Sequence, residues 1–283
     1  MKLSLSTGTL YIYPLRWIFR QASVAGFDGV ELVINPEMIL RGGGAVRRLA
    51  AEEGLDILSV HPTVVPLPGW RERHGGIGPT VRFALEAGAG IVVLHTPRSE
   101  SLDQGEGLAF CQQVEAWQRR LAGAGLRLAV ENKAVRTERE RHYALTPLSR
   151  LRAFADDRDL GLVLDTTHAG TAGEDLLEAR QMMDGRLVNV HLSDLGGRLP
   201  LARVPAVWKW VGQHRFPGAG NLALAALLTD LRDHDYGGLL TLEINPFAAR
   251  FWWPPAAQRC LAHGAAWMRR AADAAHDRGG PSQ

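Results

Sequence analysis

The sequence has few of the features that mark secreted, membrane-spanning or nucleic-acid-binding chains. Its two cysteines, Cys111 and Cys260, lie far apart in stretches with helical spacing, so a disulfide framework is not expected. No run approaches the roughly 18 to 20 apolar residues of a membrane span, and we predict no membrane partner. The 32 basic and 30 acidic residues nearly cancel to a net charge of +2, so no overall field argues for nucleic acid.

The composition instead fits a globular protein with a sizeable core. Apolar residues make up 46% of the chain and charged residues 22%. The first residues, Met1 to Ser4, open directly into a strand pattern, without the uninterrupted apolar segment of a signal peptide. We therefore expect a reduced, cytoplasmic protein.

Short aliphatic segments of strand length recur along the whole chain. Stretches with the apolar spacing of helices lie between them, for example after Pro79 and over Leu222 to Leu231. Only the interval that holds the Pro- and Gly-punctuated stretch from Leu195 to Gly220 is long, and it is interpreted as an extended loop. The expected strands are Lys2 to Thr7, Gly29 to Ile34, Asp56 to His61, Ile91 to His95, Arg127 to Glu131, Gly161 to Asp165, Leu187 to His191 and Leu239 to Glu243.

This alternation predicts an α/β fold, a single closed (β/α)₈ TIM barrel of parallel strands over residues 1–270. An open doubly wound sheet would need a Gly-rich phosphate loop after its first strand, which Ser6 to Thr9 does not supply. Residues 271–283 lose the helical spacing and are expected to form a frayed tail. The barrel places the expected active site at its C-terminal rim.

Metal-competent side chains end six consecutive expected strands. Parallel barrel strands point their C-terminal ends at one face, so residues far apart in the sequence converge there. Each of them alone could be an ordinary hydrogen-bonded residue. Together they are harder to explain, because several carboxylates at the ends of apolar runs are costly to bury unless a cation holds them. The six residues are His61, His95, Glu131, Asp165, His191 and Glu243.

Seven motifs at these strand ends and in the following loops resemble those of the xylose isomerase-like barrel superfamily, which includes sugar isomerases, sugar epimerases and the endonuclease IV family. The resemblance covers nearly the whole chain, with the motifs in the family's order. They are Val60-His61-Pro62, Leu94-His95-Thr96-Pro97, Val130-Glu131-Asn132, Asp165-Thr166-Thr167-His168, Val190-His191-Leu192-Ser193-Asp194, His214 to Gly220, and Leu242-Glu243-Ile244.

The resemblance implies that Glu131, Asp165, His191 and Glu243 form a shared site for a divalent metal. Three oxygen ligands and one imidazole suit Mn²⁺, Mg²⁺ or Co²⁺, and Zn²⁺ also accepts such a set. The implied function is a metal-dependent isomerase or epimerase of carbohydrate metabolism that acts on a small sugar or sugar phosphate. Glu131 and Glu243 would serve as acid and base, and the metal would stabilise an enediolate.

Two further residues are candidates for substrate binding. His168, three residues after Asp165, would reach a substrate hydroxyl or a second ion, or would simply begin a helix. Arg198, in the loop after His191, would bind a substrate oxygen or phosphate, or would be a solvated loop residue.

An endonuclease IV-like zinc-dependent phosphodiester hydrolase of abasic DNA is the main alternative, and the only one with a nucleic-acid partner. His61, His95, His168 and His214 match histidines that help bind a zinc cluster in that family. Gly212 stands where that family has an Asp, however, and residues 62–65 lack its apolar wedge for the duplex. A third alternative is a barrel that binds a metal or ligand without turnover.

Aromatic residues follow the first and last expected strands. Trp17 lies after the first strand, and Trp252 and Trp253 lie in the run from Asn245 to Pro255. Rings at a barrel mouth stack on sugar faces and exclude water, so these three are predicted to line the pocket. The other interpretation is a cover for the barrel edge or a subunit contact, and a homodimer is one option left open.

Overall fold

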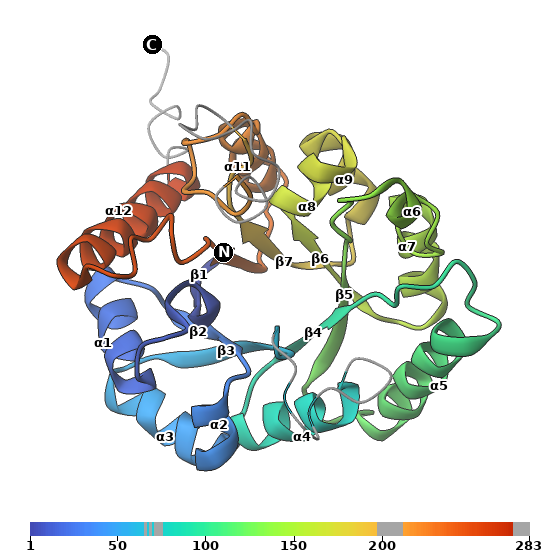
Figure 1. Cartoon of the computed structure of the whole chain (residues 1–283), viewed down its shortest axis with the longest axis horizontal. Helices are drawn as coiled ribbons and strands as arrows, with labels where there is room; N and C mark the ends of the chain where they lie inside the picture. Colours follow the sequence, from blue (N-terminus) through green and yellow to red (C-terminus); the bar gives the residue numbers. More distant parts are fainter. Residues whose placement is uncertain (65–66, 68–69, 71–75, 197–211, 274–283) are drawn as a thin grey trace, which may run out of the picture.

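Eight parallel strands close into a barrel in chain order, surrounded by helices (Figure 1). This computed structural model describes residues 1–64, 67, 70, 76–196 and 212–273. The predicted (β/α)₈ barrel is confirmed. The strands are β1 Lys2–Ser6, β2 Gly29–Val33, β3 Asp56–His61, β4 Ile91–His95, β5 Arg127–Glu131, β6 Gly161–Asp165, β7 Leu187–Leu192 and β8 Leu239–Leu242.

The helices lie on the outside of the barrel or in the connections at its rim (Figure 1). In the described part of the chain they are η1 Thr7–Leu10, α1 Leu15–Ala25, α2 Pro36–Arg41, α3 Gly43–Glu52, α4 Ile77–Ala87, α5 Gly105–Arg120, α6 Glu138–Arg141, α7 Leu148–Asp157, α8 Thr166–Ala172, α9 Leu176–Met183, α11 Leu224–Asp233 and α12 Pro254–Asp273. Helix α12 runs three residues beyond the expected barrel limit, and residues 274–283 of the expected tail lie outside the described residues.

The strand limits follow the aliphatic pattern closely. Strands β3 to β6 begin and end where expected, and the other four differ by one residue at their C-terminal ends. At the first of these ends, Thr7 leaves the β1 ladder because it opens the 3₁₀ turn η1. The C-terminal rim is therefore where the sequence places it.

Alternate strand residues point into the barrel. Val93, Ala129 and Val163 form a fully buried apolar cluster of their own on β4, β5 and β6. Two residues later the same strands end in His95, Glu131 and Asp165, which therefore lie above an apolar floor. The main core packs the outward faces of the strands against the helices, with Phe19, Leu128 and Leu151 among its fully buried side chains.

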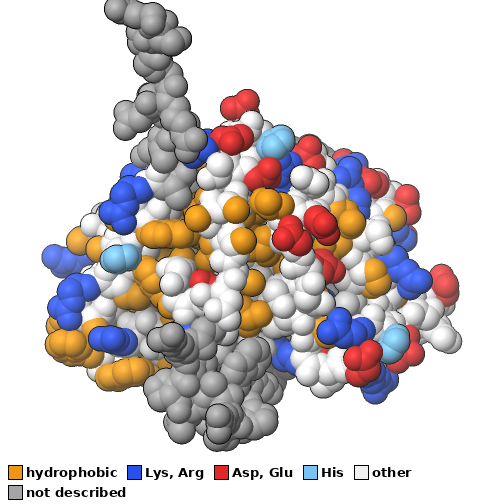
Figure 2. All heavy atoms as spheres, turned by 90° about the horizontal axis from the view of Figure 1, so that it is seen from above, with side chains coloured by type: hydrophobic (Ala, Val, Ile, Leu, Met, Phe, Trp, Pro, Cys, Tyr) orange, Lys and Arg blue, Asp and Glu red, His pale blue; other side chains and the backbone are white. Residues whose placement is uncertain are grey.

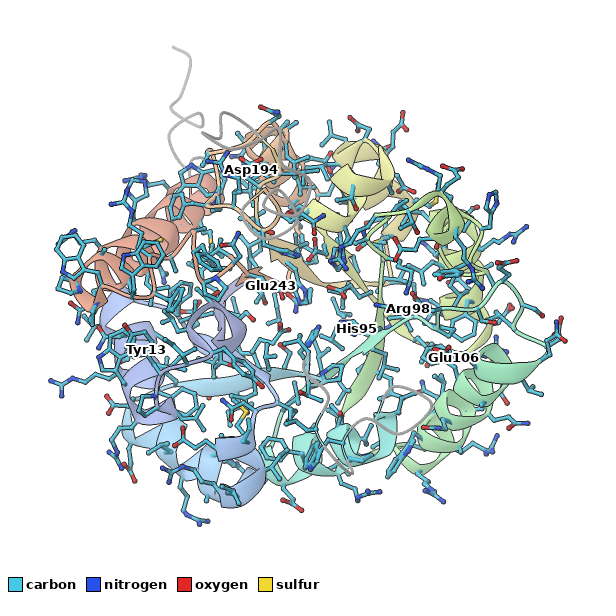
Figure 3. The ribbon with its side chains drawn as sticks, viewed as in Figure 1. Tyr13, His95, Arg98, Glu106, Asp194 and Glu243 are labelled. Atoms are coloured by element: carbon cyan, nitrogen blue, oxygen red, sulfur yellow. The ribbon has the colours of Figure 1, made fainter. Side chains whose placement is uncertain are left out.

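Asp194 organises the segment that returns to the barrel after β7. Its buried carboxylate accepts hydrogen bonds at 2.9 to 3.0 Å from the backbone N–H groups of Leu195, Gly218, Gly220 and Leu222. A Cβ at Gly220 would lie 2.3 Å from Asp194 Oδ1, so only glycine fits. Asp194, labelled in Figure 3, also forms a backbone β-bridge with Arg215, the residue after His214. Residues 197–211 of the expected long loop lie outside the described residues.

The surface and the cysteines agree with the composition. Basic and acidic side chains lie side by side on the right of the face that Figure 2 shows, whereas the charged side chains along its left edge are basic. Both cysteines are free thiols, as expected. Among the helices of the described ranges, none combines the length and the apolar character needed to span a bilayer.

Glu174, between α8 and α9, is a carboxylate whose burial raises its pKa from 4.5 to about 7. As the pH rises, the Glu174 carboxyl loses its proton near pH 4.5 in the unfolded chain but only near pH 7 in the folded one. The free energy of unfolding therefore falls between these two pH values. We expect Glu174→Gln to raise the free energy of unfolding by about 1 to 2 kcal/mol at pH 8, allowing for partial exposure, and to change it little at pH 4. Urea unfolding at both pH values measures this. The exposed Glu178→Gln is the control, and equal changes at both pH values would contradict the prediction.

Candidate metal centre

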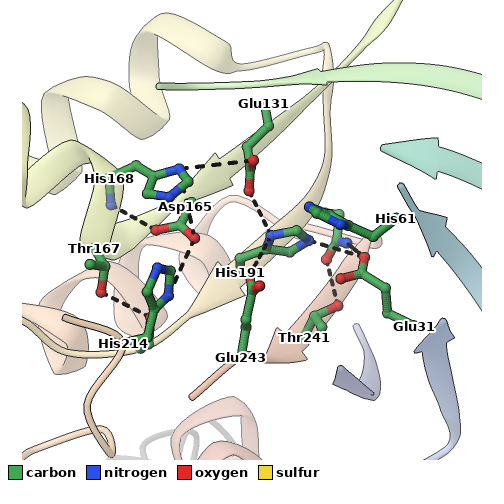
Figure 4. Close-up of polar contacts among 12 residues, drawn as sticks. Glu31, His61, Glu131, Asp165, Thr167, His168, His191, His214, Thr241 and Glu243 are labelled. Atoms are coloured by element: carbon green, nitrogen blue, oxygen red, sulfur yellow. Dashed lines mark hydrogen bonds and ion pairs between the residues drawn. The ribbon is translucent and has the colours of Figure 1, made fainter. Parts of the chain in front are cut away.

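The four residues implied as metal ligands converge at the C-terminal rim (Figure 4). Ligand atoms of Glu131, Asp165, His191 and Glu243 all lie within 4.8 Å of one another. His191 Nδ1 is 2.8 Å from Glu131 Oε1 and 2.9 Å from Glu243 Oε2. The parallel register sets Asp165 opposite His191, so ligands from neighbouring strands start side by side.

A second group extends the centre toward β3 and β4. His61 Nε2 and His95 Nε2 face each other at 2.9 Å, and His95 Nε2 lies 3.5 Å from Glu131 Oε2. The three residues satisfy the same ligand-atom criterion as the central group and share Glu131 with it. Loss of hydration in the mouth and the neighbouring His61 lower the pKa of His95 to about 3, so its imidazole is neutral at pH 7.

A third group shares Asp165 with the centre and contains His168 and His214. Asp165 Oδ2 lies 3.9 Å from His168 Nδ1 and 3.8 Å from His214 Nδ1. Asp165 also caps α8, because its Oδ1 accepts the His168 N–H at 2.7 Å, so His168 lies in the first turn of a helix, and its role toward a substrate or a second ion stays a prediction. His214 adopts φ +49°, an unusual conformation for a residue with a side chain, and Ser193 Oγ lies 3.2 Å from its ring.

Charges in the centre shift the protonation of its members. Burial raises the pKa of Asp165, with Glu131 and Glu243 acting in the same direction. Burial would also raise the pKa values of Glu131 and Glu243, but the neighbouring histidines hold both well below the usual range. Burial would lower the pKa values of His191 and His168, but the carboxylates around them raise both. Imidazolium groups thus supply the positive charge that the carboxylates need.

The donor set fits a divalent cation. Asp165 Oδ2 is buried and receives no hydrogen bond from the described residues. A buried carboxylate oxygen without a donor is costly, and a cation held between Asp165, Glu131 and Glu243 would satisfy it. Glu131 and His191 would complete a set of three oxygen ligands and one imidazole.

Glu31 contacts the centre and is not predicted from the sequence. It is fully buried in β2, and its Oε2 lies 3.1 Å from His191 Nε2. Ser59 Oγ and Asn189 Nδ2 donate to the same oxygen at 2.8 and 3.2 Å. Glu31 therefore contacts one ring nitrogen of His191, and Glu131 and Glu243 lie next to the other. A carboxylate on the far side of a histidine ring orients the imidazole toward a metal. The available signal was a charged residue at an inward position between Val30 and Leu32.

We expect Glu31→Gln to weaken divalent metal binding by about 10- to 100-fold, although Glu31 is not a ligand. The substitution keeps the side-chain shape but removes the negative charge that makes the His191 imidazole a stronger donor. Titration calorimetry with Mn²⁺ measures the change. Ser59→Ala, which removes only one hydrogen bond to Glu31, should have a smaller effect, and an unchanged affinity in Glu31→Gln would contradict the assignment.

The centre opens on a cavity of about 890 Å³, within the usual range for small-molecule sites. Glu131 and Glu243 line it together with three cationic residues, Arg98, Lys133 and Arg136. Burial and the nearby Arg98 charge lower the pKa of Lys133 to about 8, so it stays mostly protonated at pH 7. Figure 3 shows His95 and Arg98 on the β4 side of the mouth and Glu243 on the other side. Arg198, expected to bind substrate, lies outside the described residues.

The expected aromatic lining is corrected by the structure. Trp17, Trp252 and Trp253 are not among the residues that line the cavity. Trp17 is half-buried on α1, stacks on Tyr13 at 4.1 Å and packs against the core. Trp252 and Trp253 are 61% and 49% exposed just before α12. Among the described residues, the cavity wall instead contains the aromatic side chains of Trp70, Phe110 and Phe247.

Comparison with known proteins decides the family. A family model described as xylose isomerase-like TIM barrel matches residues 19–279. The chain belongs to this family. An uncharacterized protein of Mycobacterium tuberculosis (strain H37Rv) is 30% identical over 273 residues, covering 88% of this chain and 91% of that protein.

Solved structures share the xylose isomerase-like fold at lower identity. A xylose isomerase-like TIM barrel/4-hydroxyphenylpyruvate dioxygenase fusion protein has a TM-score of 0.71 and 20% identity. The match covers 100% of this chain but only 45% of the fusion protein. A 3-keto-D-glucoside 4-epimerase from E. coli has a TM-score of 0.64 and 18% identity, with 95% and 99% coverage of the two chains. A family 2 AP endonuclease from Brucella melitensis has a TM-score of 0.65 and 18% identity, with 90% and 98% coverage.

Proposed function

We propose that this protein is a divalent-metal-dependent isomerase or epimerase of a sugar or sugar phosphate. The observation that carries the proposal is the placement of Glu131 and Glu243. These carboxylates come from β5 and β8, three positions apart around the barrel, and flank His191 Nδ1 at 2.8 and 2.9 Å. Both line a cavity of small-molecule size. Two carboxylates that reach one substrate from different sides suit removal and return of a proton at carbon.

Each residue of the site has a defined task in this proposal. Glu131, Asp165, His191 and Glu243 would hold the metal, which when bound would polarise a substrate carbonyl and favour loss of the adjacent proton. Glu243, 20% exposed to the cavity, would take that proton, and Glu131 would return one from the β5 side. Uncharged His95, at the mouth, would bind a substrate hydroxyl. An epimerase among the structures that share the fold is compatible with this chemistry.

Hydrogen exchange with solvent tests the proposal without knowledge of the exact sugar. The metal-loaded protein is incubated in D₂O with a panel of ketoses and ketose phosphates, and deuterium at the carbon next to the carbonyl is followed by mass spectrometry. We expect incorporation with at least one member of the panel. Absence of incorporation from every member, with metal bound, would contradict the proposal.

A second candidate function, zinc-dependent hydrolysis of abasic DNA, is favoured by one specific observation. The group of His61 and His95 shares Glu131 with the central group, and the group of His168 and His214 shares Asp165 with it. Each shared carboxylate would bridge two adjacent ions, an arrangement that suits phosphodiester hydrolysis. The third group, however, holds only Asp165, His168 and His214, because Gly212 offers no ligand side chain.

Metal content separates the two functions. We expect one divalent ion per chain by elemental analysis, with deuterium exchange and no cleavage of an abasic duplex. Two or three zinc ions per chain, together with strand cleavage, would establish the second function instead.

A further inference from the structure

We propose that Arg98, Lys133 and Arg136 form a subsite for an anionic group of the substrate, a phosphate or a carboxylate, on the β4 and β5 side of the cavity. The inference rests on the proposed function only in placing the substrate in this cavity. All three residues line the cavity, and all three follow strands whose ends carry members of the metal centre.

The barrel register brings these cations together. Strands β4 and β5 pair with His95 opposite Glu131. Arg98 follows His95 by three residues and Lys133 follows Glu131 by two, so both chains leave the barrel side by side. Arg136 lies three residues further along the second segment. The positive charges thus lie beside the metal centre, at one side of its mouth.

Lys133 is the inner member of this cluster. It is half-buried, its Nζ donates to the Thr96 carbonyl at 3.1 Å, and it lies 5.5 Å from the centre of the Tyr143 ring. These contacts fix the ammonium group and leave it donors for a ligand, since an ammonium has three. Within the part of the chain that the structure describes, Lys133 has no ion-pair partner.

The two arginines also keep their charge available. Arg136 Nε donates to Gln213 Oε1 at 3.2 Å, a neutral partner. Both arginines are exposed to solvent, and in the described ranges neither guanidinium forms an ion pair. A planar guanidinium offers paired donors that match the oxygens of phosphate and carboxylate.

Two carboxylates in the same wall, Glu106 and Glu140, accept hydrogen bonds from backbone N–H groups and form no ion pair with the three cations among the described residues. Glu106 Oε1 accepts the Arg98 N–H at 3.3 Å. Glu140 Oε2 accepts the N–H groups of Arg136 and Thr137 at 2.6 and 3.0 Å, as part of a capping box on α6. They therefore shape the loops that present the cations. None of the three cations forms an ion pair among the described residues, so an oxyanion would accept their remaining N–H donors.

Binding by the metal-loaded full chain tests the subsite. Titration calorimetry compares D-fructose, D-fructose 6-phosphate, inorganic phosphate and acetate on protein loaded with Mg²⁺. We expect a charged probe to bind at least about 10-fold more tightly than fructose, with phosphate and acetate showing which oxyanion is preferred. Lys133→Met and Arg98→Leu should each reduce that preference by roughly 10-fold or more.

Arg139→Ala is the matched control, because this exposed arginine pairs with Glu100 and is not among the residues that line the cavity. Thermal unfolding checks that each variant is folded. If Lys133→Met does not fold, Arg98→Leu still tests the subsite, because Arg98 is exposed. Equal binding of fructose and all charged probes, or a preference that survives both substitutions, overturns the subsite. An anion preference that depends on Lys133 without any deuterium exchange supports the subsite and removes the proposed function.

Discussion

A Glu243→Gln variant saturated with divalent metal is expected to exchange solvent hydrogen into its substrate about 10² to 10⁴ times more slowly than the unsubstituted protein. Glutamine keeps the shape of the side chain and an oxygen that can contact a metal, but it cannot accept a proton at pH 7. Glu243 lines the cavity and follows β8 directly, so the substitution removes a base without changing the strand that carries it. Initial rates of deuterium incorporation at saturating metal measure the loss.

Glu174→Gln serves as the control for this experiment. It makes the same chemical change between α8 and α9, at a residue that is not in the cavity lining, and should leave the exchange rate unchanged. If Glu243→Gln binds metal and exchanges hydrogen at the full rate, Glu243 only holds the ion. If neither the variant nor the parent protein turns over any substrate while both bind metal, a non-catalytic barrel is the better description.

Divalent metal is expected to raise the free energy of unfolding by about 4 kcal/mol when free metal exceeds its dissociation constant roughly 1000-fold. At a fixed metal concentration this stabilisation should increase with pH, because His191 must lose a proton before it can bind the metal. Without metal, the carboxylates of Glu31, Glu243 and Glu131 outweigh burial and raise the pKa of this imidazole well above 6.5. A histidine with a raised folded pKa stabilises the fold below pH 6.5 and loses that contribution as the pH rises through the folded value. A metal binds only the neutral imidazole. At high pH it therefore replaces the stabilisation that the protonated His191 provided, and at low pH it competes with the proton for the ring.

Urea unfolding in Mn²⁺ and in EDTA at pH 6, 7 and 8.5 measures this dependence. Asp165→Asn, which weakens a ligand that is fully buried, should reduce the difference between the two conditions at every pH. A difference that is independent of pH would show that proton release from the centre is not linked to binding. The same unfolding midpoint with Mn²⁺ and EDTA would remove the metal site itself.

The fold and the convergence of the proposed inner ligands can be predicted from the sequence, because both depend on the strands. Aliphatic runs define the strands within one residue, and parallel closure sends every strand end to the same rim. Glu131, Asp165 and His191 end such runs or lie within them, so their convergence follows from topology alone.

Other parts of the site depend on orientations that a strand pattern does not encode. Glu31 lies within a strand and not at its end, and its contact with His191 spans the interior between β2 and β7. Trp17 was expected in the cavity because of its proximity in sequence to β1, but its ring, on α1, stacks on Tyr13. The cluster of Arg98, Lys133 and Arg136 depends on loop paths, which alternation of apolar residues does not specify.

The proposed metal ligands and the proposed anion-binding cations belong to different parts of the βα units. Glu131 ends a strand that is hydrogen-bonded on both sides, whereas Lys133 and Arg136 lie beyond the last strand residue. Insertions and exchanges after the strand end can alter the second set without shifting the first. During divergence, such a barrel can acquire a preference for a differently charged metabolite while its ion-binding chemistry is inherited intact.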